Sequence, residues 1–105
     1  MDIIKLRKQT AAARASKDAV LDSEFNNSPL KEYIDHLIQE AANNGESELS
    51  LNFFNIKERV LGERYGGPTL DATSRHYSNE GFSVYIKSWL SPNGYGSTIL
   101  VISWM

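Results

Sequence analysis

One amphipathic helix, beginning at Ser28, constrains the fold of this chain more than any other feature. Ser28 and Pro29 form a typical helix start, because the serine hydroxyl caps a free backbone N–H and proline needs no partner there. Apolar side chains then follow at i, i+3, i+4, i+7, i+8 and i+11: Leu30, Tyr33, Ile34, Leu37, Ile38 and Ala41. This spacing predicts one wide apolar face. Gly45 can end the helix by adopting a positive φ. The helix must therefore pack against a second layer.

Three segments have the pattern of β-strands. Residues 48–53 and 82–87 alternate polar and apolar side chains, which is typical of half-buried strands, and the second can continue to Leu90. The third covers 97–104, and its run at 99–102 is apolar on both faces. Such a run is typical of a central strand, or of one buried in an interface. A turn at 91–94, containing Pro92 and Gly94, makes the last two strands a hairpin.

Two shorter helices are predicted between the first and second strands, at about 55–65 and at 69–79, separated by Gly66-Gly67-Pro68. In the second we expect Leu70, Thr73 and Tyr77 to point inward. This order of elements predicts an α+β fold, with a three-stranded, mainly antiparallel sheet and helices on one face. The unpaired edges of a three-stranded sheet favour pairing with another subunit.

Residues 3–24 contain good helix formers, and Asp2 can cap the helix. The apolar stripe is thin and interrupted by polar residues; its members are Ile3, Leu6, Ala13 and Val20. A helix with so thin a stripe is rarely a central core element. We therefore predict an N-terminal helical arm over 1–27 that docks on a neighbour, with disorder as the alternative, and a single α+β domain over 28–105.

Charge is unevenly distributed along the chain. Residues 1–20 carry a net charge of +3, residues 21–50 carry −6, and the whole chain carries −2. A basic arm followed by an acidic segment suggests head-to-tail contact between subunits, or packing within one chain, and we expect a homo-oligomer. Nucleic-acid binding usually needs a denser basic face and is not expected.

The sequence holds no cysteine, which excludes disulfides and thiolate chemistry. No segment approaches the roughly 20 apolar residues that span a bilayer, and the N-terminus lacks the apolar core of a signal peptide. We therefore expect a cytoplasmic protein without a membrane partner.

Neither histidine belongs to a catalytic or metal-binding motif. His36 shares one helical face with Glu32 and Glu40, and a solvated, charge-paired face explains this better than a metal site does. The sequence also lacks a pair of catalytic carboxylates and a nucleophile motif. We expect no catalytic residue, metal or cofactor.

A candidate ligand-binding cluster lies between the two short helices. Arginine pairs bidentately with phosphate, tyrosine stacks on bases, and glycines before a helix let backbone N–H groups approach an anion. The residues concerned are Arg59, Arg64, Tyr65, Gly66, Gly67, Thr69, Arg75, His76 and Tyr77. The alternative is that the glycines only break the chain, while the arginines pair on the surface with Glu58, Glu63 and Glu80.

The hairpin carries a second group of aromatic residues, Tyr85, Trp89, Tyr95 and Trp104. They could form a stacking platform. A tryptophan one residue from the end of the sequence more often closes a core or an interface, and we favour that interpretation.

Three segments, spread over residues 28–104, carry a resemblance to a known class: 38–45 at a helix end, 80–84 at a strand start and 99–104 at the end of the chain. Together they resemble small uncharacterised proteins of tailed bacteriophages, although the connection 54–80 is longer here. The resemblance implies a non-enzymatic role, as a host-factor inhibitor, a ligand sponge or a virion part, in the host cytoplasm.

Two hypotheses for the function follow. The first is an oligomeric binding protein that sequesters a phosphate-bearing nucleotide immune signal, and so counteracts host defence, through the cluster at 59–77. The alternative is a protein-binding inhibitor of a host factor, or a virion structural component, that uses the arm and the aromatic hairpin.

Overall fold

The computed structural model describes residues 2–63, 67–90, 92 and 96–105. In chain order the elements are α1 (Ile3–Asn26), α2 (Pro29–Asn43), β1 (Glu48–Asn52), α3 (Phe53–Leu61), α4 (Leu70–Asn79), β2 (Ser83–Leu90) and β3 (Gly96–Ser103). The predicted α+β fold with an N-terminal helix and a three-stranded antiparallel sheet is confirmed.

The strand that ends the chain is the central one, because the sheet order is β1-β3-β2. In one row across the sheet, Ile102 stands between Leu49 of β1 and Val84 of β2. A central strand has neighbours on both edges, and Leu100, Val101 and Ile102 are all buried. The interpretation of the apolar run at 99–102 as a central strand is therefore confirmed.

The core lies between one face of the sheet and the helices. Its buried members come from all four helices and from β1 and β3: Phe25, Leu30, Ile34, Leu51, Phe53, Ala72, Tyr77, Leu100 and Ile102. The alternate residues of the strands form the other face, where Ser50, Val101 and Tyr85 stand in one row. None of these three belongs to the core cluster. The sheet thus packs its helices on one face, as predicted.

Helix α2 begins and ends where its sequence predicts. The Ser28 hydroxyl accepts a hydrogen bond from the backbone N–H of Leu30 at 3.0 Å, and Pro29 occupies the first turn. Leu30 and Ile34 are fully buried. Gly45 has φ +81°, a left-handed conformation that glycine adopts without a Cβ clash. The wide apolar face therefore joins α2 to the sheet.

Helix α3 differs from its predicted span of 55–65. It starts at Phe53, directly after β1, because the Asn52 side chain caps it by accepting from the backbone N–H of Asn55. It ends at Leu61, because Gly62 takes φ +75° and donates its N–H to the carbonyl oxygen of Glu58 at 2.8 Å. Gly62 lies inside the predicted span and terminates the helix there.

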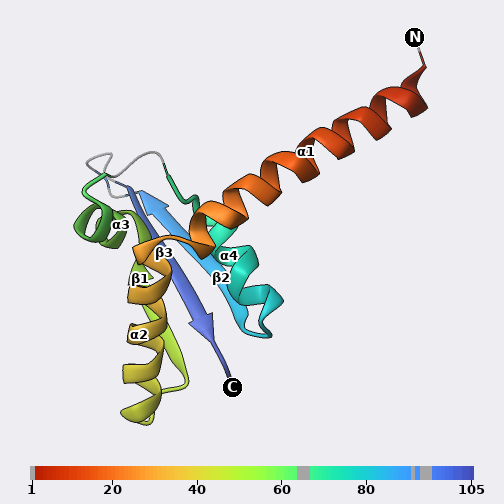
Figure 1. The fold of residues 1–105 in the computed structure, drawn as a ribbon. Helices are drawn as coiled ribbons and strands as arrows, with labels where there is room; N and C mark the ends of the chain where they lie inside the picture. The colour runs from red at the N-terminus through yellow and green to blue at the C-terminus, as the bar shows by residue number, and fades with distance from the viewer. Residues whose placement is uncertain (1, 64–66, 91, 93–95) are drawn as a thin grey trace.

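Helix α1 leaves the body of the molecule and extends into solvent (Figure 1). Every residue from 2 to 20 is exposed, and only the last turns of the helix enter the core, through Leu21 and Phe25. We call residues 3–20 the α1 arm. At about 1.5 Å per residue, the arm is roughly 27 Å long, and the molecule reaches 56 Å along its longest axis.

A matched pair of substitutions on neighbouring strands tests this placement of the core. Leu100 and Ile86 face each other in the β2–β3 register, but Leu100 is fully buried whereas Ile86 is 41% exposed. We expect Leu100→Ala to lower the free energy of unfolding by about 2–5 kcal/mol. Ile86→Ala should lower it by about 1 kcal/mol or less. Urea unfolding of both variants measures the difference. Because the two residues share one face of the sheet, equal losses would contradict the burial of Leu100 in the core next to a solvent-exposed Ile86.

Candidate functional site

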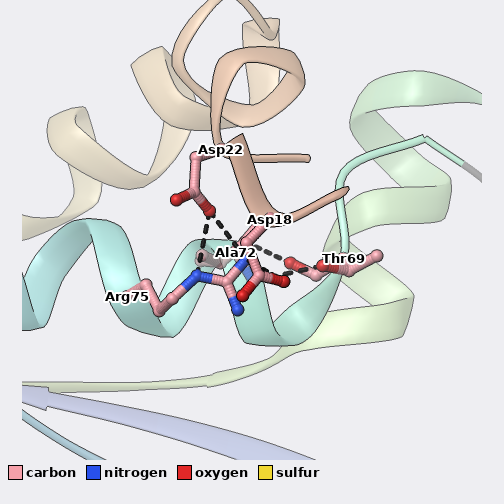
Figure 2. A network of polar contacts seen from close by, with 6 residues as sticks. Asp18, Asp22, Thr69, Ala72 and Arg75 are labelled. Carbon is pink, nitrogen blue, oxygen red and sulfur yellow. Dashed lines mark hydrogen bonds and ion pairs between the residues drawn. The ribbon is translucent and has the colours of Figure 1, made fainter. Parts of the chain in front are cut away.

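Two helices far apart in sequence, α1 and α4, are joined by one arginine. Nε and Nη2 of Arg75 donate hydrogen bonds to Oδ1 of Asp22 at 3.0 and 2.7 Å (Figure 2). Oδ1 of Asp18, one turn earlier on α1, lies 3.8 Å from Nη2. The hydrogen bond to Asp22 raises the pKa of Arg75 further above its ordinary value. The contact is therefore an ion pair at any pH at which the two carboxyl groups are ionised.

The start of α4 sets the position of this arginine. Oγ1 of Thr69 accepts from the backbone N–H of Ala72 at 3.1 Å and so caps the helix (Figure 2). Oγ1 of Thr73 donates to the Thr69 carbonyl oxygen at 2.9 Å, which reinforces the first turn. Arg75 then stands half-buried on the side of α4 that faces α1. Thr69, which the sequence offered as a ligand contact, is thus the helix cap.

Three aromatic rings pack behind the ion pair. Phe25, the last large apolar residue of α1, lies edge-to-face against His76, with ring centroids 5.1 Å apart, and against Tyr77 at 5.9 Å. Such edge-to-face pairs add about 0.5–1.5 kcal/mol to the burial of the rings. Phe25 and Tyr77 are fully buried. We call these contacts between Asp22 and Phe25 of α1 and Arg75, His76 and Tyr77 of α4 the junction. The junction holds the end of α1 by a buried aromatic side chain and by an ion pair.

Tyr77 also links α4 to α2. Its hydroxyl donates to Oδ1 of Asp35 at 2.7 Å, and Oδ2 of the same carboxylate receives Nζ of Lys31 at 2.8 Å. Burial is the main reason that the pKa of Tyr77 is raised far above its ordinary value, and the hydrogen bond to Asp35 adds to it. The pKa of Lys31 is also raised, through its hydrogen bond to Asp35. The phenol is thus kept neutral in the folded protein.

A hollow of about 400 Å³ opens beside the junction. Its lining combines two carboxylates with amide, hydroxyl and imidazole groups: Asp22, Ser23, Asn26, His76, Asn79 and Glu80. Nε2 of His76 lies 3.3 Å from Oε1 of Glu80, and the imidazole is mostly buried. The hollow is unfavourable for a phosphate, because the two negatively charged carboxylates in its wall would repel the negative charge of the phosphate.

The predicted ligand-binding cluster is thus only partly assembled. The junction brings Thr69, Arg75, His76 and Tyr77 together. The side chains of Thr69, Arg75 and Tyr77 have hydrogen-bond partners within the chain. The buried Nε2 of His76 has no hydrogen-bond partner among the described residues, although it lies 3.3 Å from Oε1 of Glu80. Arg75 forms an ion pair, as the alternative interpretation expected, but with Asp22 of α1 and not with a neighbouring glutamate. Phosphate binding through these side chains stays a prediction.

The rest of the predicted cluster lies on and after α3. Arg59 stands exposed in the last turn of α3. Lys57, two residues before Arg59, is buried, with Nζ 5.9 Å from the ring centroid of Phe53, and burial lowers its pKa. Gly67 has φ +63°. Residues 64–66, which include Arg64, Tyr65 and Gly66, lie outside the described part of the chain.

The hairpin aromatics do not share one environment. Trp104 is half-buried, packs edge-to-face on Phe82 with centroids 6.3 Å apart, and donates its backbone N–H to the Ser47 carbonyl oxygen. It therefore packs against Phe82, which in turn packs against the core. Tyr85 is exposed on the outer face of the sheet. The side chain of Trp89 and residue 95 lie outside the described part.

His36 stands exposed on α2, with Nε2 3.7 Å from Oε2 of Glu40, which is the solvated, charge-paired arrangement that its spacing favoured. Within residues 2–63, 67–90, 92 and 96–105, no three acidic, histidine or cysteine side chains gather as a metal site would need. Among the same residues, no helix combines the length and the hydrophobicity that crossing a bilayer requires.

The α1 arm carries exposed apolar side chains that have no partner in the core cluster. Its large apolar side chains are 46–66% exposed: Ile3, Ile4, Leu6 and Val20. Sequence reasoning found this arm but missed what holds its base. The signal was present, because Asp18 and Asp22 stand four residues apart and so share one helical face. Nothing local, however, names their partner 53 residues away.

The chain was compared with family models, with curated proteins and with solved structures, and no match was found. What the protein does must therefore be inferred from the geometry of its own residues. The two features that bear on function are the junction between α1 and α4 and the α1 arm, which projects from this junction.

The ion pair at the base can be tested by a double-mutant cycle. We expect Arg75→Gln and Asp22→Asn each to destabilise the protein by about 1 kcal/mol, and the double variant to lose little more than either one. Urea unfolding at low and high salt measures the coupling, which should shrink as salt screens the pair. Strictly additive losses would show that the two side chains do not interact.

The raised pKa of Tyr77 predicts a loss of stability in alkali. An unfolded tyrosine ionises at an ordinary pKa of 10.0, whereas the buried phenol of Tyr77 stays protonated above that pH. Stability from this group is therefore complete below pH 10 and falls as the pH rises further. Tyr77→Phe should flatten the fall between pH 9 and 11, and Tyr85→Phe, at an exposed site, should leave it unchanged. Parallel curves for all three proteins would refute this role.

Proposed function

We propose that this protein is a non-enzymatic binding protein that acts by docking the α1 arm against another protein. The observation that carries the proposal is the run of exposed residues from 2 to 20, all but the first within a single continuous helix. Within it, four large apolar side chains face solvent without a partner in the chain's own core. Solvent-exposed apolar side chains along a projecting element are typical of an interaction surface.

The energetics of an isolated helix support the same conclusion. In proteins, most of the stability of a helix comes from the packing of its apolar face against other elements, and less from the helix propensity of its residues. The α1 arm has no such packing, because its contacts with the core begin at Leu21. A partner that covers the arm would supply the missing contacts.

The arm is also held in one direction. At its base, Phe25 is fully buried and Asp22 is bound to Arg75 of α4. The helix runs unbroken from this anchor to Ile3. A continuous helix fixed at one end presents its side chains in a defined arrangement, which reduces the entropy lost on binding.

Of the roles implied by the resemblance to small tailed-phage proteins, inhibition of a host factor and a place in the virion both require a protein-binding surface. The α1 arm suits either. Sequestration of a nucleotide has less support, because the carboxylates of Asp18 and Asp22 already occupy the guanidinium of Arg75. Calorimetry with cyclic and ADP-ribose-type nucleotides separates the two hypotheses, since only the sequestration hypothesis expects heat of binding.

Photo-crosslinking from single positions tests the proposal. A photoreactive phenylalanine analogue placed at Leu6 or Val20 should give covalent adducts with a protein when it is activated in cells, because both side chains lie exposed on the arm. The same analogue at His36, exposed on α2 in the body of the molecule, is the matched control. Adducts from the arm alone support the proposal. Adducts from neither arm position, or turnover of a substrate by the purified protein, would overturn it.

A further inference from the structure

We propose that the partner of the α1 arm is the α1 arm of a second copy of this chain, paired with it in antiparallel orientation. This inference rests on the proposed function and names its partner. The pairing face consists of Leu6, Ala13 and Val20, which we call the arm ridge. All three side chains lie exposed on α1.

The arm ridge has the spacing of a helix–helix seam. Its members follow one another at intervals of seven residues, and Ile3 extends the row by one further position. A seven-residue repeat keeps side chains on one line along a pair of helices that wind around each other. Two polar residues, Thr10 and Lys17, occupy the intervening positions of the seam. The pairing is therefore expected to be reversible and not a permanent coiled coil.

The ridge lies on the side of α1 that points away from the body. Successive residues of a helix are about 100° apart. Phe25, Asp22 and Asp18 turn toward α4 and the core, and the ridge is more than a quarter turn from the middle of that side. A second helix can therefore lie along the whole ridge without meeting the sheet.

A hollow at the base of the arm provides a place for the tip of the second arm. It measures about 450 Å³ and is lined by Ala19, Val20, Ser23, Glu24 and Asn27. When two arms pair antiparallel about Ala13, Leu6 of each stands opposite Val20 of the other. Each hollow then receives the leucine of the other copy. The small side chain of Ala13 at the centre lets the two helices approach closely.

Charge favours the antiparallel over the parallel orientation. Residues 1–20 carry a net charge of +3, and residues 21–50 carry −6. Parallel arms would bring Lys5, Arg7 and Lys8 of one copy beside the same residues of the other. Antiparallel arms bring this basic tip to the end of α1 that bears Glu24 and continues into the acidic segment. Opposed helix dipoles add to the preference.

The arrangement is self-limiting. The same surface of each copy contacts the other about a two-fold axis, so that the assembly closes as a dimer. The interface would cover the arms only, leaving the outer face of the sheet accessible. The α1 arm, which lacks packing contacts within one chain, would gain them in the dimer.

Disulfide trapping tests the pairing, and the absence of cysteine in the chain makes each introduced thiol unique. A disulfide needs Cβ atoms about 3.5–4.5 Å apart. Under mild oxidation, Ala13→Cys should give a covalent dimer. An equal mixture of Leu6→Cys and Val20→Cys should give the mixed dimer, identified by intact mass. Ala15→Cys, nearly on the opposite side of the helix from Ala13, is the control and should stay monomeric. All these positions are exposed, so each variant keeps the fold.

Three outcomes distinguish this inference from the proposed function. Ala13→Cys and Ala15→Cys dimers in equal amount, or none from either, would overturn the pairing of arms. A dimer of Leu6→Cys with itself, in place of the mixed dimer, would overturn the antiparallel orientation. Photo-crosslinks from Leu6 to a protein other than this chain, without any disulfide dimer, would overturn the inference and leave the proposed function standing.

Discussion

The shape of this molecule depends on how α4 holds the end of α1. Phe25 packs in the core beside His76 and Tyr77. Arg75 binds Asp22, which lies three residues before Phe25 on α1. Without these contacts the first 20 residues would be a free helix with no fixed direction. With them, the arm projects from the core in a fixed direction. The burial of Phe25, together with a partly exposed ion pair between residues 53 positions apart, therefore decides where the exposed apolar side chains of the arm are presented.

Much of the fold follows from local chemistry and could be predicted. Three local signals predict their elements correctly. They are the helix cap at Ser28–Pro29, the helical spacing of apolar residues in α2 and the continuous apolar run of β3. The predicted end of α3 is wrong, because a glycine within a helical sequence pattern is compatible both with a weakened helix and with a helix end. Gly62 takes φ +75° and ends the helix after Leu61.

The candidate site was harder to predict for a related reason. Arginine, tyrosine and threonine near paired glycines carry the same chemistry whether they face a ligand or the chain itself. Here Thr69 caps α4, Arg75 binds α1 and the hydroxyl of Tyr77 binds Asp35 of α2. Arg75 and Tyr77 stand on one helix, but the partners of their side chains come from helices that are distant in sequence. Only tertiary structure separates a binding site from a joint between helices.

The central claim is that the α1 arm is completed by another arm. Hydrogen exchange of the backbone amides of residues 4–20, measured over a range of protein concentrations, tests it most directly. An arm covered by a second copy gains protection as the concentration rises, because association removes the open helix from exchange. The account predicts slowing of exchange in the arm with no change in the strands of the sheet. Exchange in the arm that is equally fast at every concentration would contradict it.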